Sequence, residues 1–192
     1  MALIWENNEI PDDLIPCDMM VIYKNKSKDL RSNYRALGLL NHSYKTFSMV
    51  LLQRIVPYIE PGLSDIQARF RKGRGCRDNI LTMAIHHLLE NVQSTEQTAG
   101  IITYIDFVAA FDSINHSYML ESLKMYNVPL KYIRLVRAIY SNAAVRVRQQ
   151  EVGGNRIGAI QGDIPSPIAF LVSLDRLLKE HGGLETGIPI TP

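Results

Sequence analysis

The stretch that decides the fold is Tyr104-Ile105-Asp106-Phe107-Val108-Ala109-Ala110-Phe111-Asp112-Ser113-Ile114-Asn115-His116. An apolar run over residues 101–105 predicts a short buried strand that ends at Asp106. A strand end holds a carboxylate in place beside an open loop, and Mg²⁺ prefers oxygen ligands. We therefore identify Asp106 as a candidate metal ligand, with the backbone carbonyl of Phe107 as a second donor. An acidic residue at a strand end is also a common turn or capping residue, and the residues alone leave that interpretation open.

Hydrophobic periodicity predicts the elements on either side of this stretch. Strands are predicted over residues 19–23, 34–40 and 145–150, and helices over 43–59, 79–92, 117–126, 130–140 and 168–179. Pro57 is expected to end the first helix early. The last strand is predicted to pair with residues 155–160 across Gly153-Gly154. Ser166 is predicted to cap the last helix, with Pro167 at its first position.

Basic residues are concentrated in one part of the chain. Residues 19–77 hold 12 Lys and Arg against three acidic residues, a net charge of +9, and the remainder carries −7 although the whole chain has only +2. One cluster lies in the predicted hairpin turn at residues 24–31, and a second at residues 69–77 surrounds Gly73 and Gly75. This segregation is typical of proteins that bind nucleic acid or nucleotides, and a solvated basic face is an equal alternative.

Length and composition exclude several classes of protein. A chain of 192 residues with 46% hydrophobic and 21% charged residues is expected to fold as one or two globular domains. Cys17 and Cys76 lack the spacing of a zinc site or a disulfide framework, which indicates a reducing compartment. No run approaches the ~20 apolar residues of a membrane span, and the acidic N-terminal segment is unlike a signal peptide. We expect an intracellular protein, nuclear or cytoplasmic, without a membrane partner.

Four segments, taken together and in order, resemble the motifs of a known family. Residues 104–116 resemble motif A of the reverse transcriptases of non-LTR (LINE-type) retrotransposons. Residues 22–24 with 33–40 resemble the fingers segment, 67–78 resemble the next fingers motif, and 161–167 resemble motif B. The similarity covers about residues 5–179, which is nearly the whole chain.

The resemblance implies a fold and an activity. The implied fold is α/β (α+β), with the fingers and part of the palm of a right-hand polymerase and with helices packed on a mixed or antiparallel sheet. Residues 1–95 would form an N-terminal extension and the fingers, and residues 96–192 a partial palm with motifs A and B. The implied activity is RNA-directed DNA polymerisation, a nucleotidyl transfer that uses Mg²⁺, deoxynucleoside triphosphates, an RNA template and a DNA primer. The alternatives are a non-catalytic nucleic-acid-binding remnant and a group II intron maturase-type relative.

The resemblance also implies roles for individual residues. Asp106 matches the first catalytic aspartate, which bridges two magnesium ions, and Phe111 matches the steric gate that excludes a ribose 2′-hydroxyl. The implied nucleotide-binding residues are Lys24, Arg35, Phe107, Phe111, Gln161 and Gly162. The implied template-binding residues are Gln67, Arg71, Lys72 and Arg74.

The chain departs from the family pattern at several positions. Ala36 replaces a proline, Arg69 replaces the glycine of Gln-x-Gly-Phe-Arg, Ile160 replaces an arginine, and Ile164 begins a changed Pro-Leu-Ser-Pro. A side chain at Arg69 would disturb the backbone if the family glycine adopts a special conformation. Motif C, a Tyr- or Phe-x-Asp-Asp hairpin, is not present in the 192 residues. We therefore expect this fragment to be inactive by itself.

Overall fold

The computed structural model of the chain comprises two compact units. Unit 1 is formed by Met1–Gly62 with Ala109–Pro192, and unit 2 by Leu63–Val108. The structure describes residues 2–11, 14, 17–24, 27–30, 33–65, 67–93, 106–108, 110–141, 145–147, 150–152, 158–159 and 162–181. The predicted strand at residues 101–105 lies outside these ranges. The boundary between fingers and palm at residue 95 stays a prediction.

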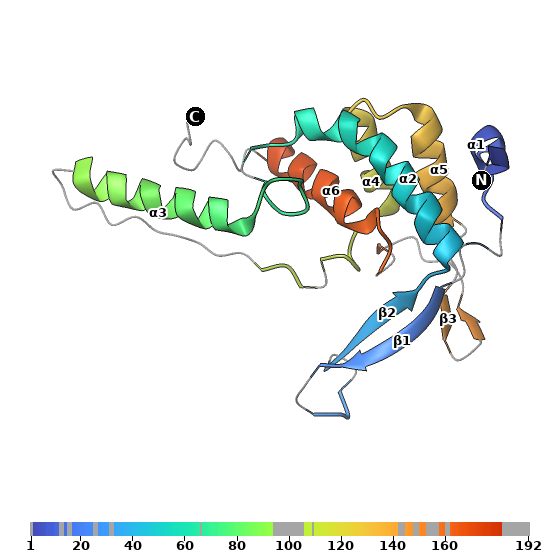
Figure 1. Cartoon of the computed structure of the whole chain (residues 1–192). Coiled ribbons are helices and arrows are strands. Elements are labelled where there is room, and N and C mark those ends of the chain that lie inside the picture. Colours follow the sequence, from blue (N-terminus) through green and yellow to red (C-terminus); the bar gives the residue numbers. More distant parts are fainter. Residues whose placement is uncertain are drawn as a thin grey trace. The chain divides into compact units, whose positions relative to one another are not determined.

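Unit 1 contains a four-stranded mixed sheet with the strand order β2-β1-β3-β4. Strands β1 (Cys17–Tyr23) and β2 (Tyr34–Leu39) pair antiparallel, with Tyr23 opposite Tyr34 at the turn end of the hairpin. Strand β3 (Val145–Val147) pairs parallel to β1, and β4 (Gln150–Val152) pairs antiparallel to β3. The hairpin of β1 and β2 extends away from helix α2, which follows it in the chain (Figure 1). The predicted hairpin and mixed sheet are confirmed.

The prediction for the second hairpin is wrong in its pairing. Strand β4 begins already at Gln150, whereas residues 155–160 were expected to be the partner strand. Of that expected strand, Gly158 and Ala159 are described, and their amide N–H groups donate to the carbonyl oxygens of Ile114 and Phe111. The chain thus turns between Val147 and Gln150, before the local turn signal Gly153-Gly154, and Gly158 and Ala159 pair with groups far away in the sequence.

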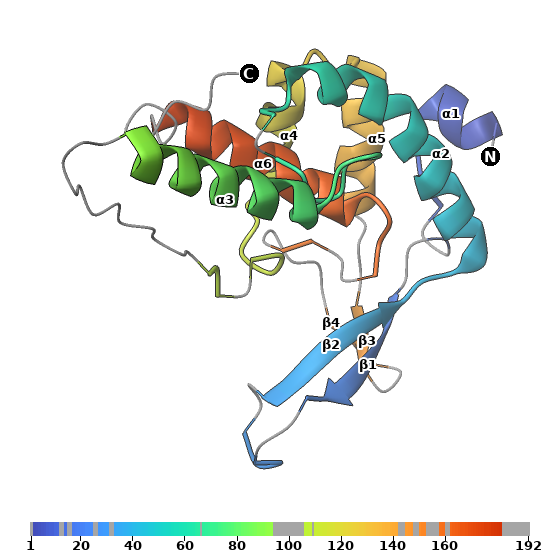
Figure 2. The ribbon, with the colours of Figure 1, turned by 60° about the vertical axis from the view of Figure 1, so that its left-hand side comes forward.

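Helices form most of the core of unit 1. They are α1 (Ala2–Asn7), α2 (His42–Ile59), α4 (His116–Met125), α5 (Leu130–Ser141) and α6 (Ser166–Glu180), with a short 3₁₀ turn η2 (Glu60–Gly62) after α2. Each of the four longer helices buries an apolar stripe, and α4 packs against both α5 and α6 (Figure 2). Fully buried side chains at the centre include Phe47, Leu51, Met119, Leu135, Ile139, Leu171 and Val172.

Two helix ends differ from the prediction. Helix α2 continues through Pro57 to Ile59, because the proline lies in the last turn, where the buried Ile55 and Ile59 hold the helix against the core. Helix α6 starts at Ser166 instead of being capped by it, and its N-cap residue Pro165 forms no side-chain capping bond. Ser166 is 3% exposed and is already part of the first turn.

Unit 2 consists of a turn-rich segment followed by helix α3 (Cys76–Gln93). The carboxylate of Asp78 accepts a hydrogen bond of 3.0 Å from the backbone N–H of Gly75, which satisfies a donor at the helix start. The predicted helix over residues 79–92 is thus confirmed.

No helix in the described part of the chain is long and apolar enough to cross a membrane.

Candidate active site and nucleic-acid interface

The motif A turn (residues 110–115) is held by the segment that precedes motif B. The N–H of Ala159 donates to the carbonyl oxygen of Phe111 at 2.7 Å, and the N–H of Gly158 donates to that of Ile114 at 2.8 Å. Nε2 of His116 lies 2.8 Å from the carbonyl oxygen of Gly158. These three contacts join two segments far apart in the sequence, so the turn has a defined backbone position.

Gly158 is required by this arrangement. Its φ of +99° is in the region that L side chains rarely adopt, and a Cβ there would lie 3.1 Å from the carbonyl oxygen of Asp112. Asp112 itself is exposed. The close approach of the two backbones depends on a residue without a side chain.

The ring of Phe111 packs against helix α6. Its centroid lies 5.2 Å from that of Phe170, with an angle of 36° between the planes. Phe111 is partly exposed. A ring supported on one side and open on another can act as a steric barrier to a neighbouring group.

The motif B loop (residues 162–165) contacts strand β2 through backbone atoms. Gly162 is exposed and has a φ of +95°, and a Cβ at this position would lie only 2.8 Å from the carbonyl oxygen of Gly38. The sequence suggested that Gly162 allows close approach to a ligand, and the close approach that the structure shows is to β2. Gln161 lies outside the described residues.

Asp163, next in the loop, is buried with 4% exposure. Burial raises the pKa of its carboxyl to about 7, and interactions with the Tyr44 and Ser48 hydroxyls and the Ile164 N–H favour the charged form and limit the rise. These groups lie close enough to act electrostatically, but neither carboxyl oxygen accepts a hydrogen bond of normal geometry. The loop is thus anchored in the core by a titratable group.

The hairpin carries the predicted triphosphate ligands. Lys24 is exposed just after β1, and its backbone N–H donates to the carbonyl oxygen of Asn33 at 2.8 Å. Arg35 lies in β2 opposite Ile22, and its side chain is outside the described set. The rings of Tyr23 and Tyr34 lie 5.4 Å apart, and the Lys28 ammonium is 6.0 Å from the Tyr23 ring centroid. Cations and aromatic faces therefore gather at this end of the hairpin.

The predicted template-binding residues of unit 2 fall into two groups. Arg71 is 8% exposed, and its Nη1 donates to the carbonyl oxygens of Ser64 at 2.8 Å and Gln67 at 3.1 Å. Arg74 pairs with Asp65 at 2.6 Å, and Lys72 is exposed. The Arg71 guanidinium thus stabilises the loop. The Arg74 guanidinium is partly exposed and also donates to the carbonyl oxygen of Asp65 at 2.7 Å, whereas Lys72 faces solvent.

Arg69 does not adopt the special conformation that its substitution for glycine suggested. The left-handed residue is its neighbour Phe70, with a φ of +61°, and the Arg69 guanidinium lies 5.0 Å from the Phe70 ring centroid. The backbone at residue 69 therefore accepts a side chain, and the left-handed conformation lies at Phe70.

Asp106 and Phe107 lie near the end of unit 2, and both are exposed, Phe107 at 50%. An exposed carboxylate has the right chemistry for a hard cation. Within the described residues, no three His, Cys, Asp or Glu side chains form a group able to hold a metal ion. These residues by themselves do not complete a two-magnesium site. A palm requires Asp106, Phe111 and Gly162 to converge on one cleft. Asp106 belongs to unit 2 and the other two to unit 1, so this convergence stays a prediction.

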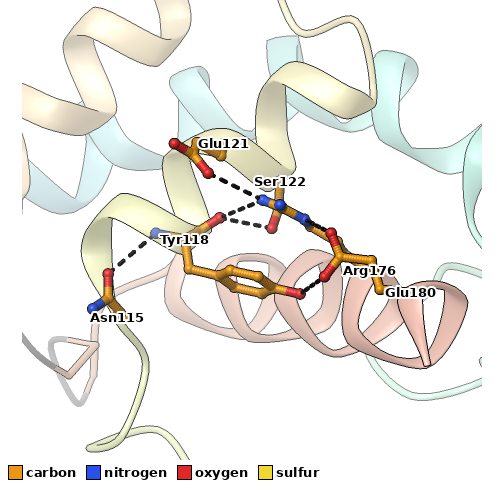
Figure 3. Close-up of polar contacts among 6 residues, drawn as sticks. All are labelled: Asn115, Tyr118, Glu121, Ser122, Arg176 and Glu180. Atoms are coloured by element: carbon orange, nitrogen blue, oxygen red, sulfur yellow. Dashed lines mark hydrogen bonds and ion pairs between the residues drawn. The ribbon is translucent and has the colours of Figure 1, made fainter.

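A polar clip fixes the helix that follows motif A. The Asn115 side chain caps α4 by accepting from the Tyr118 N–H at 3.2 Å, and the Tyr118 hydroxyl donates to Glu180 of α6 at 2.9 Å (Figure 3). Arg176 donates to Glu180 at 2.7 Å and lies 3.6 Å from Glu121. Arg176, with a smaller contribution from the Tyr118 hydroxyl, holds the pKa of Glu180 below its usual range. Burial and Glu180 raise the pKa of Tyr118.

Sequence reasoning missed three residues of this site. Gly158, His116 and Asp163 connect motif A, motif B and the core, but none was assigned a role. A glycine in a predicted strand is a weak signal of close backbone approach. Asp163 is surrounded in the sequence by turn-forming residues, which gave no indication of its burial.

Comparison with known proteins agrees with these motifs. The family model of reverse transcriptase (RNA-dependent DNA polymerase) matches residues 22–183. The chain is 28% identical over 183 residues to the Retrovirus-related Pol polyprotein from type-2 retrotransposable element R2DM of Drosophila melanogaster. This alignment covers 92% of this chain and 17% of that protein. It is 27% identical over 152 residues to the corresponding polyprotein from type-1 retrotransposable element R2 of Nasonia vitripennis, with 76% and 14% covered.

A third relative is the Transposon TX1 uncharacterized 149 kDa protein of Xenopus laevis, 24% identical over 147 residues, with 76% of this chain and 10% of that protein covered. The chain thus spans less than a fifth of the length of these curated relatives. The family match covers most of the chain and agrees with the motif order and the mixed sheet. The chain therefore belongs to the reverse transcriptase family, as a domain of the non-LTR retrotransposon type.

Proposed function

We propose that this chain is the fingers and part of the palm of an RNA-directed DNA polymerase, which adds deoxynucleotides to a primer on an RNA template. The observation that carries the proposal is the backbone connection of the motif A turn to the segment before the motif B loop, with Ala159 bonded to Phe111 at 2.7 Å. A polymerase must hold the segments that line its nucleotide site at fixed distances, and a rigid backbone does so better than loops.

Each residue would have a role that its exposure allows. The supported ring of Phe111 would exclude a 2′-hydroxyl by steric contact, and exposed Gly162 with Gln161 would contact the nucleotide and the template. Lys24 and Arg35 would bind the triphosphate through charge-assisted hydrogen bonds. Asp106, with the Phe107 carbonyl, would hold magnesium, which when bound activates the primer hydroxyl and stabilises the leaving pyrophosphate.

The template would follow the cations of unit 2. We assign its phosphate contacts to Lys72 and Arg74, with Gln67 beside them, because these side chains are at least partly accessible. The Arg71 guanidinium donates to two backbone carbonyl groups, so we assign Arg71 the role of stabilising this loop. Such contacts position nucleic acid without reading its sequence.

Primer extension on an RNA template tests the proposal. The chain is assayed alone and joined to the motif C hairpin and thumb of a related element, with deoxynucleotides and magnesium. We expect product from the joined protein only, loss of that product in Asp106→Asn, and ribonucleotide incorporation in Phe111→Ala. Product that survives Asp106→Asn would contradict the assignment of Asp106.

A non-catalytic nucleic-acid-binding protein is the second candidate, favoured by the exposed cations of the hairpin and of unit 2. It would bind primer–template without magnesium and without any effect of Asp106→Asn. Salt-dependent binding together with no extension by the joined protein would select this alternative.

A further inference from the structure

The motif B loop changes from exposed to buried between two consecutive residues. Gly162 is exposed, whereas the next residue, Asp163, is 4% exposed. The Asp163 carboxyl interacts with Tyr44 and Ser48 of α2 and with Tyr140 of α5. One side chain therefore anchors the loop between two core helices that lie far from it in the sequence.

Within the described part of the chain, hydroxyl groups and a backbone amide surround this carboxyl. Among the described residues, no Lys, Arg or His forms an ion pair with Asp163, and neither of its oxygens accepts a hydrogen bond of normal geometry. Burying an ionised carboxylate without a paired cation is costly, whereas the neutral acid avoids most of this cost. The site therefore favours the protonated form.

The same anchor controls the position of Gly162. The closest backbone approach of the loop to β2 is at Gly162, where a Cβ would meet the Gly38 carbonyl oxygen at 2.8 Å. Gly162 and Asp163 share a peptide group, so a displacement of the buried Asp163 side chain would move the backbone that makes this approach.

We propose that Asp163 is a positioning residue of the motif B loop: its neutral form holds Gly162 against β2, and its ionisation releases the loop and weakens nucleotide binding. The link to nucleotide binding rests on the proposed function, whereas the link between protonation and loop position does not. The polymerase would thus lose affinity for deoxynucleoside triphosphates as the pH rises.

The change falls near neutral pH. Burial raises the pKa of Asp163 to about 7. The other titratable groups that face it are Tyr44 and Tyr140, and burial raises the pKa of Tyr140 well above its usual value. His116 contacts the far side of this cluster, with its ring 4.8 Å from that of Tyr140. Tyr140 therefore stays neutral in this range.

The direct test is a carboxyl ¹³C NMR titration of the 192-residue chain, combined with amide hydrogen exchange of residues 158–166. We expect a midpoint near pH 7 for Asp163 and loss of amide protection in this segment above it. Asp163→Asn should make the protection independent of pH. Tyr44→Phe should move the midpoint to higher pH, because the Tyr44 hydroxyl stabilises the charged form.

The matched control is Asp175→Asn, which changes another buried aspartate of unit 1 that is paired with Lys179 at 2.7 Å. It should leave the pH dependence of segment 158–166 unchanged. A midpoint below pH 5, or a protection profile in Asp163→Asn equal to that of the parent, would overturn the proposal.

Kinetics of the joined polymerase test the second step. From pH 7 to pH 8 the KM for deoxynucleoside triphosphates should rise about fivefold relative to Asp163→Asn, because only the neutral fraction binds. A purely structural role would lower kcat and stability without this pH-dependent change in KM. Equal KM profiles would contradict the step. Absence of extension by every joined protein would refute the proposed function, and the NMR and exchange results would still decide the positioning role.

Discussion

The backbone N–H of Ala159 donates a 2.7 Å hydrogen bond to the carbonyl oxygen of Phe111, beside a second bond of 2.8 Å from Gly158 to Ile114. The two bonds attach the residue matched to the steric gate to the segment that leads into the motif B loop. The position of the Phe111 ring therefore depends on backbone geometry at Gly158 as well as on its packing against Phe170.

Gly158→Ala should destabilise unit 1 by about 1–3 kcal/mol, since it adds strain at a φ of +99° and a contact with the Asp112 carbonyl. Urea unfolding with hydrogen exchange of segment 110–116 measures this. The control Gly73→Ala has a φ of +75° and open space around its Cβ, so it should cost only about 1 kcal/mol within unit 2. Equal costs would show that the contact with Asp112 is unimportant.

Asn115→Ala should cost about 1 kcal/mol, because it removes the side chain that accepts the Tyr118 N–H at the start of α4. Asn115→Ser retains an acceptor and should recover most of this stability. Thermal unfolding of the three proteins is sufficient for the comparison. If the alanine and serine variants melt together, the cap does not stabilise the helix.

Tyr118→Phe should raise the pKa of Glu180 slightly and leave it below the ordinary glutamate value. Arg176 makes the largest contribution to the lowered pKa, and the Tyr118 hydroxyl makes a smaller one. Arg176→Gln should raise the pKa of Glu180 more than Tyr118→Phe does. Because the pKa of Glu180 is lower in the folded chain than in the unfolded chain, Glu180 stabilises the fold at a pH above its unfolded pKa. This stabilisation is lost as the pH falls through its folded pKa. A carboxyl ¹³C titration reports both variants, and an unshifted Glu180 in both would mean that the clip is not formed in solution.

The stability of unit 1 should fall as the pH rises from about 4 to 7. Asp163 has a raised pKa of about 7, so the folded chain keeps a proton that the unfolded chain releases near pH 4. Asp163 makes its full contribution to the stability of unit 1 below its pKa in the unfolded chain. This contribution is lost as the pH rises through its pKa in the folded chain. Asp163→Asn should reduce this decrease of stability with pH. Relative to the parent, its free energy of unfolding should rise by about 2–4 kcal/mol between pH 5 and pH 8. Urea unfolding at the two pH values measures this difference, and an equal pH dependence of stability in the two proteins would contradict the raised pKa of Asp163.

Binding to an RNA–DNA duplex should weaken by about 10³-fold between 50 and 200 mM salt if some six phosphates are contacted. Lys72→Ala and Arg74→Ala should each lower the salt slope by about one. Arg71→Ala should instead destabilise unit 2 by about 1–3 kcal/mol, because the carbonyls of Ser64 and Gln67 lose a buried donor. Fluorescence anisotropy and hydrogen exchange separate these effects. A larger slope change in Arg71→Ala than in Lys72→Ala would reverse our assignment.

Local patterns in the sequence were sufficient for most elements of the fold. Alternating and apolar runs predicted the hairpin of β1 and β2, and apolar spacing predicted the buried face of α2, from Tyr44 to Ile59. These features depend on residues a few positions apart, whose side chains share a face by the geometry of the element itself. The order of the motifs was also sufficient to indicate the family, which the match over residues 22–183 confirms.

The tertiary structure decided the partners of the loops. Gly158 and Ala159 bond to the motif A turn instead of continuing a strand, Asp163 is buried although its neighbours form turns, and Arg71 supports a loop instead of facing solvent. For Gly158, Ala159 and Asp163 the contacting carbonyl and hydroxyl groups lie far away in the sequence, whereas Arg71 contacts carbonyl groups four and seven residues before it, which the turn brings within reach. A local pattern shows which groups need a hydrogen bond or shelter from water, but only the packing of distant elements determines which groups meet that need.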